Sequence, residues 1–174
     1  TIALALGELT ITDELIIDGD IDNDGSPDVT IDANLQTRVF NINDGDSATN
    51  SSTILVGLII ENGMAQGNIS GFGGPGGNIL TFENLTVTGS IIRGGDAGYG
   101  GGIFVFENDL TISGSTINDN TGGTFGGGIY TGLGAGDLEV VNSTLSGNLV
   151  TNYGSGYGGA IYSSPSTASV TITN

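Results

Sequence analysis

The chain of 174 residues contains no cysteine and no histidine, and its only basic residues are two arginines, so lysine is absent as well. Without cysteine and histidine, Ser-His-Asp and Cys-His catalysis are impossible within the chain, and zinc lacks its usual nitrogen and sulfur ligands. Disulfides are excluded, and so is Schiff-base chemistry on lysine. The stability of the fold must therefore come from packing, hydrogen bonds or a metal held by oxygen atoms.

Positive charge is also scarce. Arg38 and Arg93 face 19 acidic residues, which gives a net charge of −17. Nucleic-acid binding and polybasic membrane anchoring both need clusters of basic residues, so we exclude both. The longest apolar runs, such as 54–60, are far too short to span a bilayer, and we expect no direct membrane insertion. An acidic chain of this kind stays soluble and attracts cations.

Glycine is abundant, with 33 residues, whereas proline contributes only 3. The apolar residues are mainly Ile, Leu and Val, and no segment shows the period of an amphipathic helix. This composition predicts an all-β fold of many short strands and tight turns. Because the chain starts at Thr1 without an initiator Met, we expect a mature or excised segment, and the composition favours a secreted or cell-surface protein.

An internal repeat is the strongest signal in the sequence. A Gly-Gly-x-Ile pattern recurs with its isoleucine at positions 79, 103, 129 and 161. A second alternating segment follows each time, at 85–88, 110–113, 138–141 and 170–173, and Ser-initiated third segments begin at 90, 115 and 143. Three short strands per repeat predict one coil of a parallel β-helix, whose coils bury their apolar faces only by stacking.

The first half repeats less regularly. Strands are expected at 9–11, 15–17, 29–31 and 39–42, and 54–60 aligns with 86–92 when Gly57 is placed on Gly89. We therefore predict a single domain over 1–174, a solenoid of about seven coils. Residues 1–62 form irregular acidic coils in this prediction, and 63–174 form the Gly-Gly-x-Ile coils.

Four motifs carry a family resemblance: Gly158-Gly159-Ala160-Ile161, the repeated Gly-Gly-Gly-Ile, residues 142–148, and the opening segment 7–11. With them the chain resembles the exported right-handed parallel β-helix repeats of bacterial polymorphic outer-membrane proteins and related surface proteins. The resemblance implies a right-handed parallel β-helix and a role in adhesion or surface structure. The chain departs from the pattern in one respect, because Phe-x-x-Asn occurs cleanly only at 40–43, far from Gly-Gly-Ala-Ile.

An acidic loop at 20–28 has the form D-x-D-x-D-G-x-x-D. Calcium binds six to eight oxygen atoms, and carboxylates at alternate positions converge when a glycine, here Gly25, allows a sharp turn. An EF-hand would need a glutamate where Ile31 stands, so we predict an isolated structural calcium site; a solvated acidic turn is the alternative. The predicted ligands are Asp18, Asp20, Asp22, Asp24, Asp28 and Asp32.

Aromatic residues recur in two columns. One precedes the glycine turns, at Phe72, Tyr99, Phe125 and Tyr157, and the other follows the aligned isoleucines, at Phe104, Tyr130 and Tyr162. Such columns either bind sugar rings or stack on one another to stabilise the corners of the coils. Four asparagines of the turns are expected to form a hydrogen-bonded ladder: Asn62, Asn118, Asn120 and Asn148.

Parallel β-helices also host polysaccharide lyases and hydrolases. A lyase needs a basic residue to take the proton, a hydrolase needs two carboxylates on one face, and the sequence shows neither arrangement clearly. We therefore predict a non-enzymatic structural protein. Its uncapped ends favour end-to-end self-association into a filament or covalent continuation in a longer chain. A glycan-binding or host-binding adhesin is the alternative.

Overall fold

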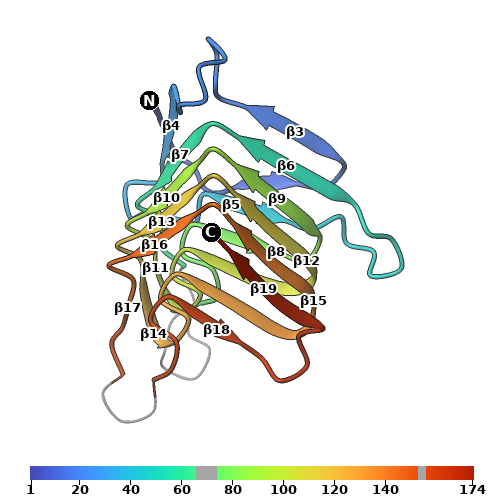
Figure 1. Cartoon of the computed structure of the whole chain (residues 1–174). Coiled ribbons are helices and arrows are strands. Elements are labelled where there is room, and N and C mark those ends of the chain that lie inside the picture. The colour runs from blue at the N-terminus through green and yellow to red at the C-terminus, as the bar shows by residue number, and fades with distance from the viewer. Residues whose placement is uncertain (66–73, 153–155) are drawn as a thin grey trace.

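The computed structural model describes residues 1–65, 74–152 and 156–174, which form an all-β solenoid of about six turns (Figure 1). All pairings between its named strands are parallel. The predicted fold class is therefore confirmed, with about six turns against the seven coils expected, while the right-handed sense stays a prediction. No helix in the described ranges is long and apolar enough to cross a membrane.

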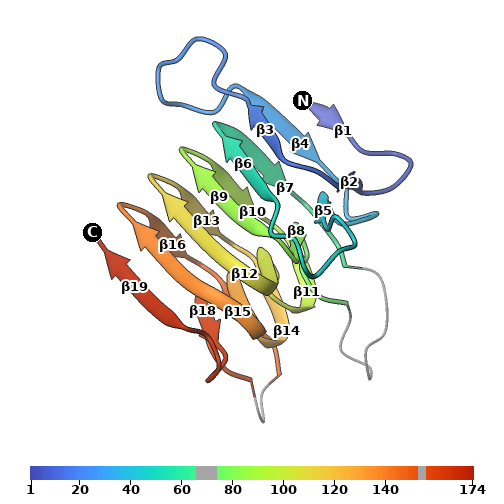
Figure 2. The same ribbon diagram turned by 90° about the vertical axis from the view of Figure 1, so that its right-hand side faces the viewer.

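Three parallel sheets form the sides of the solenoid, and Figure 2 shows their strands stacked coil upon coil. Sheet A runs through β1 (Ile2–Ala3), β4 (Val29–Asp32), β7 (Leu58–Glu61), β10 (Ile91–Arg93), β13 (Thr116–Asn118) and β16 (Thr144–Ser146). Sheet C holds β11 (Asp96–Tyr99), β14 (Thr121–Phe125) and β17 (Leu149–Val150).

Sheet B is the widest, because each coil crosses it in two arms that fuse into single long strands in two coils. One arm contains β2 (Leu9–Ile11), β5 (Phe40–Ile42), β8 (Ile79–Thr81) and β18 (Ile161–Ser163). The other contains β3 (Leu15–Asp18), β6 (Ser52–Val56), β9 (Asn84–Thr88) and β19 (Ser169–Thr173). The long strands β12 (Ile103–Ser113) and β15 (Ile129–Val141) span both arms, with register shifts where the arms meet.

The core consists of apolar columns that run along the solenoid axis. Strand register places the aligned isoleucines in one column, as the repeat predicts, where Ile79, Ile103 and Ile129 are fully buried. A second column runs along sheet A through Ile2, Ile31, Ile60, Ile92, Ile117 and Leu145. Because every coil contributes one residue to each column, the coils stabilise one another rather than folding alone.

Glycine marks one corner of the repeat coils for a steric reason. Gly100 has φ +61°, a left-handed conformation that other residues adopt only at a cost, and Gly76, Gly126 and Gly158 share it. The backbone N–H groups at this corner donate to carbonyls of the next coil, for example Gly100 N to Phe125 O at 3.1 Å. The Gly-Gly-x-Ile pattern therefore encodes a corner at which backbone packs directly on backbone.

The first coils also follow the predicted strands, and the short strand β1 precedes them. β6 pairs with β9 in the predicted register, with Val56 opposite Thr88, so Gly57 lies over Gly89. The first coils differ from the later ones mainly in the long loops between their strands.

Candidate functional site

The acidic loop is an insertion at the corner between sheets B and A. Later coils turn this corner tightly at Gly57, Gly89 and Gly114, whereas the first coil leaves at Gly19 and returns at Val29. A backbone hydrogen bond from Asp28 N to Gly19 O closes the base of the loop, and a second one from Gly19 N to Val56 O joins that base to the next coil. The loop therefore projects from the first coil, between β3 and β4 (Figure 2).

Three of the six predicted calcium ligands come together in this loop. Carboxylate oxygens of Asp20, Asp22 and Asp28 lie within 4.8 Å of one another. Backbone N–H groups hold them in place: Ile21 N donates to Asp28 Oδ2 at 2.8 Å, and Gly25 N donates to Asp20 Oδ2 at 3.0 Å. Carboxylates held this close repel one another, and a hard cation that takes oxygen ligands would offset that repulsion.

The other three predicted ligands make separate contacts and lie outside this group. The Asp24 carboxylate accepts from Ser26 N at 2.8 Å, and Asp18 accepts from Asp20 N at 3.0 Å. Asp32 lies on β4, where it accepts from Asn34 N at 2.8 Å and from Asn62 Nδ2 at 3.0 Å. Sequence spacing indicated the loop but not which of its carboxylates face one another.

The aromatic column that follows the isoleucines is a stack of rings. Phe104 and Tyr130 have ring centroids 4.7 Å apart at 17°, and Tyr130 and Tyr162 are 5.3 Å apart at 10°. Burial, together with the neighbouring Tyr162 and Tyr99, raises the pKa of the Tyr130 phenol above its usual range. In such a stack each ring covers the face of its neighbour, which is the arrangement of a stabilising ladder.

The second aromatic column stacks beside the first. Tyr99 lies on Phe125 at 5.9 Å, and Phe125 lies on Tyr157 at 5.7 Å, while Phe125 and Tyr162 join the two columns at 4.6 Å. Phe72, the fourth expected member, falls outside the described residues.

The network extends further than the repeat predicted. Phe106 contacts Phe104 at 6.3 Å, and Phe82 contacts Phe106 at 4.8 Å. Of the described aromatic residues, only the buried Phe40 lies outside this network. Phe82 directly follows β8, and Phe106 lies at the bulge of β12. The repeat loses its register at this bulge, so the sequence pattern did not indicate these two residues.

The asparagine ladder forms, but with different members from those predicted. Asn120 Nδ2 donates to Asn148 Oδ1 at 3.0 Å, and Asn78 Nδ2 donates to Asn120 Oδ1 at 3.2 Å. Strand register sets Gly95 opposite Asn120, and glycine has no side chain to continue the ladder. The Asn78 side chain, from another part of the coil, fills the space beside Gly95. Asn118 instead bonds to Asp119. Asn62 was also expected in the ladder and instead bonds to Asp32.

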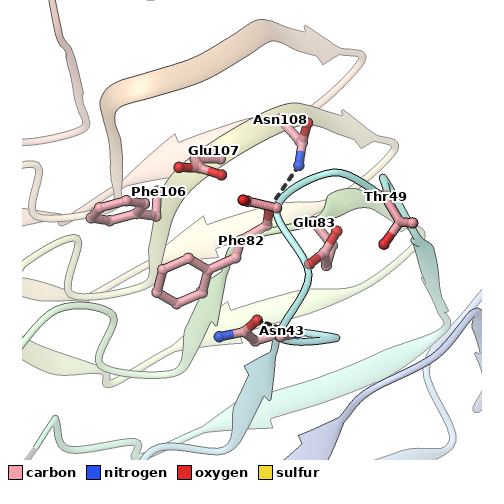
Figure 3. Close-up of a pocket in the computed structure, with 9 residues that line it drawn as sticks. Asn43, Thr49, Phe82, Glu83, Phe106, Glu107 and Asn108 are labelled. Atoms are coloured by element: carbon pink, nitrogen blue, oxygen red, sulfur yellow. Dashed lines mark hydrogen bonds between the residues drawn. The ribbon is translucent and has the colours of Figure 1, made fainter.

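A pocket opens on sheet B where its two arms meet (Figure 3). Loop 43–49 forms one side, Phe82 and Glu83 form the floor, and 106–108 form the other side. Glu83 is only 3% exposed, and its carboxylate accepts from Asp44 N at 3.3 Å and from Ser51 N at 3.2 Å. Burial, with the nearby Asp44 charge, raises the pKa of Glu83. No local sequence pattern indicates this pocket.

Comparison with known proteins adds no identity to this geometry. Neither a family model nor a curated protein nor a solved structure matches the chain.

Proposed function

We propose that this chain is a non-enzymatic structural segment of a bacterial cell surface, of the exported β-helix repeat type that its motifs resemble. In this proposal its coils stack end to end with further coils, which belong either to a neighbouring copy or to the continuation of a longer chain. Calcium bound in the loop of the first coil braces that end of the solenoid.

The observation that carries this proposal is that the core columns run through to both end faces. Val170 and Ile172 on β19 continue the inward-facing columns of Leu138 and Val140, which are buried. At this end face, however, Val170 is 46% exposed and Ile172 is 62% exposed. At the opposite face, Ile2 is 53% exposed and Leu15 is 43% exposed. Parallel strand edges with exposed apolar columns pair readily with another strand of the same kind.

The strand pairings define a register for such stacking. One column runs through Leu15, Thr53, Leu85, Leu110, Leu138 and Val170, and a parallel one ends at Ile17 and Ile172. A neighbouring copy that continues these columns places its β3 on β19, with Leu15 over Val170 and Ile17 over Ile172. Its β1 then lies over β16, with Ile2 over Leu145.

Charge placed in this column tests the proposal. We expect Val170→Lys with Ile172→Lys to abolish end-to-end assembly, because two charges would then point into the joint between coils. The matched control is Thr171→Lys, on the same strand but on the alternate face. Electron microscopy of the native material, with sedimentation velocity of each variant, measures assembly; discrete short rods in all samples would contradict the filament form.

The calcium part of the proposal is supported by the converging carboxylates of Asp20, Asp22 and Asp28. Calorimetric titration with calcium is expected to show saturable binding that is lost in the double variant Asp20→Asn with Asp28→Asn. Asp13→Asn, on an exposed aspartate outside the loop, is the control for net charge. Binding that survives the double variant would place the ion elsewhere.

Glycan binding by Phe104, Tyr130 and Tyr162 stays a prediction. A sugar ring stacks on an open aromatic face, whereas these rings cover one another along the column. We therefore do not advance it as the function of the column.

A further inference from the structure

The pocket on sheet B brings together three coils that are distant in sequence. Loop 43–49, the turn at Phe82 and Glu83, and the bulge at 106–108 line a half-open pocket of about 220 Å³ (Figure 3). Asn108 Nδ2 donates to Phe82 O at 2.7 Å, which joins two of the three coils and fixes one side of the cavity. This site is separate from the acidic loop and from both end faces.

Negative charge lines the cavity without a matching positive charge. Glu107 is half-buried and has no hydrogen-bond or ion-pair partner among the described residues. Glu83 accepts two long backbone hydrogen bonds, at 3.2 and 3.3 Å, and its carboxyl also interacts with the side chain of Asp44, which adds a second acidic group on this side of the cavity. Because burial raises the pKa of Glu83, its ionised form is disfavoured, and a nearby cation would favour it.

The chain itself cannot supply that cation. Arg38 pairs with Glu8 and with backbone carbonyls, and Arg93 pairs with Glu61. The sequence contains no lysine or histidine, so a positive charge in the cavity must come from a ligand.

The walls select among possible cations. The Phe82 and Phe106 rings lie 4.8 Å apart, tilted by 34°, and Phe106 is 45% exposed. Phenyl rings attract organic cations through their faces but supply no oxygen ligand to a metal ion. Within the described residues, the carboxylates of Glu83 and Glu107 are not part of a metal-sized group, in contrast to Asp20, Asp22 and Asp28.

We propose that this cavity binds a small organic cation, an alkylammonium group, with Glu107 and Glu83 as the charge partners and Phe82 and Phe106 as the aromatic wall. Asn43 Oδ1 already accepts from Gly45 N at 2.8 Å, so the Asn43 Nδ2 amide and the Ser47 hydroxyl on the loop side are the groups that can hydrogen-bond the rest of such a ligand. The site is independent of the proposed structural function, because no strand edge at either end face takes part in it.

Choline is the probe, and 3,3-dimethylbutan-1-ol is its uncharged isostere. Titrations are followed by calorimetry and by amide chemical shifts, at constant ionic strength and with calcium in excess so that the acidic loop does not respond. We expect saturable choline binding with shifts confined to 43–49, 82–83 and 106–108, and no saturable binding of the isostere. Glu107→Gln is expected to weaken choline binding about tenfold, and Phe106→Leu to weaken it severalfold.

Glu139→Gln is the control, because it removes one exposed carboxylate from the neighbouring strand β15 and should leave choline binding unchanged. Circular dichroism establishes that each variant keeps the fold. Absence of saturable choline binding, equal binding of the isostere, or full affinity in Glu107→Gln would overturn the proposal. Binding of a neutral methyl glycoside to the same residues with higher affinity than choline would also overturn it.

Discussion

The first coils and the repeat coils solve the same stacking problem by different means. In 74–152 the coils are held by continuous ladders of glycine backbone, asparagine and aromatic side chains. In 1–62 these ladders are largely absent, and the coils are joined instead by the ion pair between Arg38 and Glu8 and by side-chain hydrogen bonds such as that from Asn62 Nδ2 to Asp32 Oδ1. The difference shows that the corners of a parallel solenoid are free to diverge and acquire loops as long as its inward-facing columns stay in register.

The largest expected effect comes from the glycine corner. A Cβ on Gly101 would overlap the Thr121 and Gly127 carbonyl oxygens, both backbone atoms with no freedom to move aside. Gly101→Ala should therefore destabilise the fold by more than about 4 kcal/mol, measured by urea unfolding. Gly45→Ala, with φ +81° in open space in the first region, should cost only about 1–2 kcal/mol. Equal losses would mean that the two regions do not differ in backbone packing.

The asparagine ladder should rank second. Asn120→Ala leaves Gly95 N–H and the Asn78 amide without their acceptor in a buried site, and we expect a loss of about 3 kcal/mol in the free energy of unfolding. Asn118→Ala, whose amide donates only to the adjacent exposed Asp119, is the comparison and should cost less than about 1 kcal/mol. A similar cost for both would contradict a structural ladder.

Calcium removal should act on the first region alone. At a free calcium concentration 100 times the dissociation constant, the site would contribute about 2.7 kcal/mol, which a chelator removes. Hydrogen exchange should then accelerate in β3 and β4 while β13 and β16 keep their protection. Uniform acceleration along the chain would mean that the loop is coupled to the whole solenoid rather than to its own coil.

The carboxyl of Glu83 lies at the junction of the two regions and predicts a pH effect. Its pKa in the folded protein lies above its ordinary value of 4.5, chiefly because of burial. A raised pKa stabilises the fold below pH 4.5, and this stabilisation is lost as the pH rises through the raised value. In Glu83→Gln the fall in stability over that window should be smaller than in the parent chain, as measured by urea unfolding at a series of pH values. Glu139→Gln should keep the parent slope.

The smallest effect is expected at the ion pair between Arg93 and Glu61, which joins the two regions on the outside of sheet A. The Arg93 side chain is 46% exposed, so solvent screens the pair. Arg93→Gln should change the free energy of unfolding by less than about 1 kcal/mol and should leave the register of β10 on β7 intact. A larger loss would show that the boundary between the regions depends on this contact.

Features with a fixed repeat were predictable from the sequence, and features that depend on loops were not. The stacking of Ile79, Ile103, Ile129 and Ile161 follows from one residue type at one place in each coil. The repeat did not indicate Asn78, because the residue at the corresponding ladder position in the sequence is Gly95. The Asn78 side chain reaches that position from elsewhere in the coil. Of the acidic loop, spacing located the segment, but hydrogen bonds to the backbone select Asp20, Asp22 and Asp28 from the six aspartates.

By itself, the sequence determined that this chain is an all-β parallel solenoid, because only coils that present identical apolar positions at the same place can bury them against one another. It also determined which chemistries are excluded, since no folding supplies a missing histidine or cysteine. The tertiary structure alone decided which polar groups meet. Glu83 and Glu107 lie on different coils, and their presence in one pocket with loop 43–49 depends on how each coil bends at sheet B, which no local pattern records.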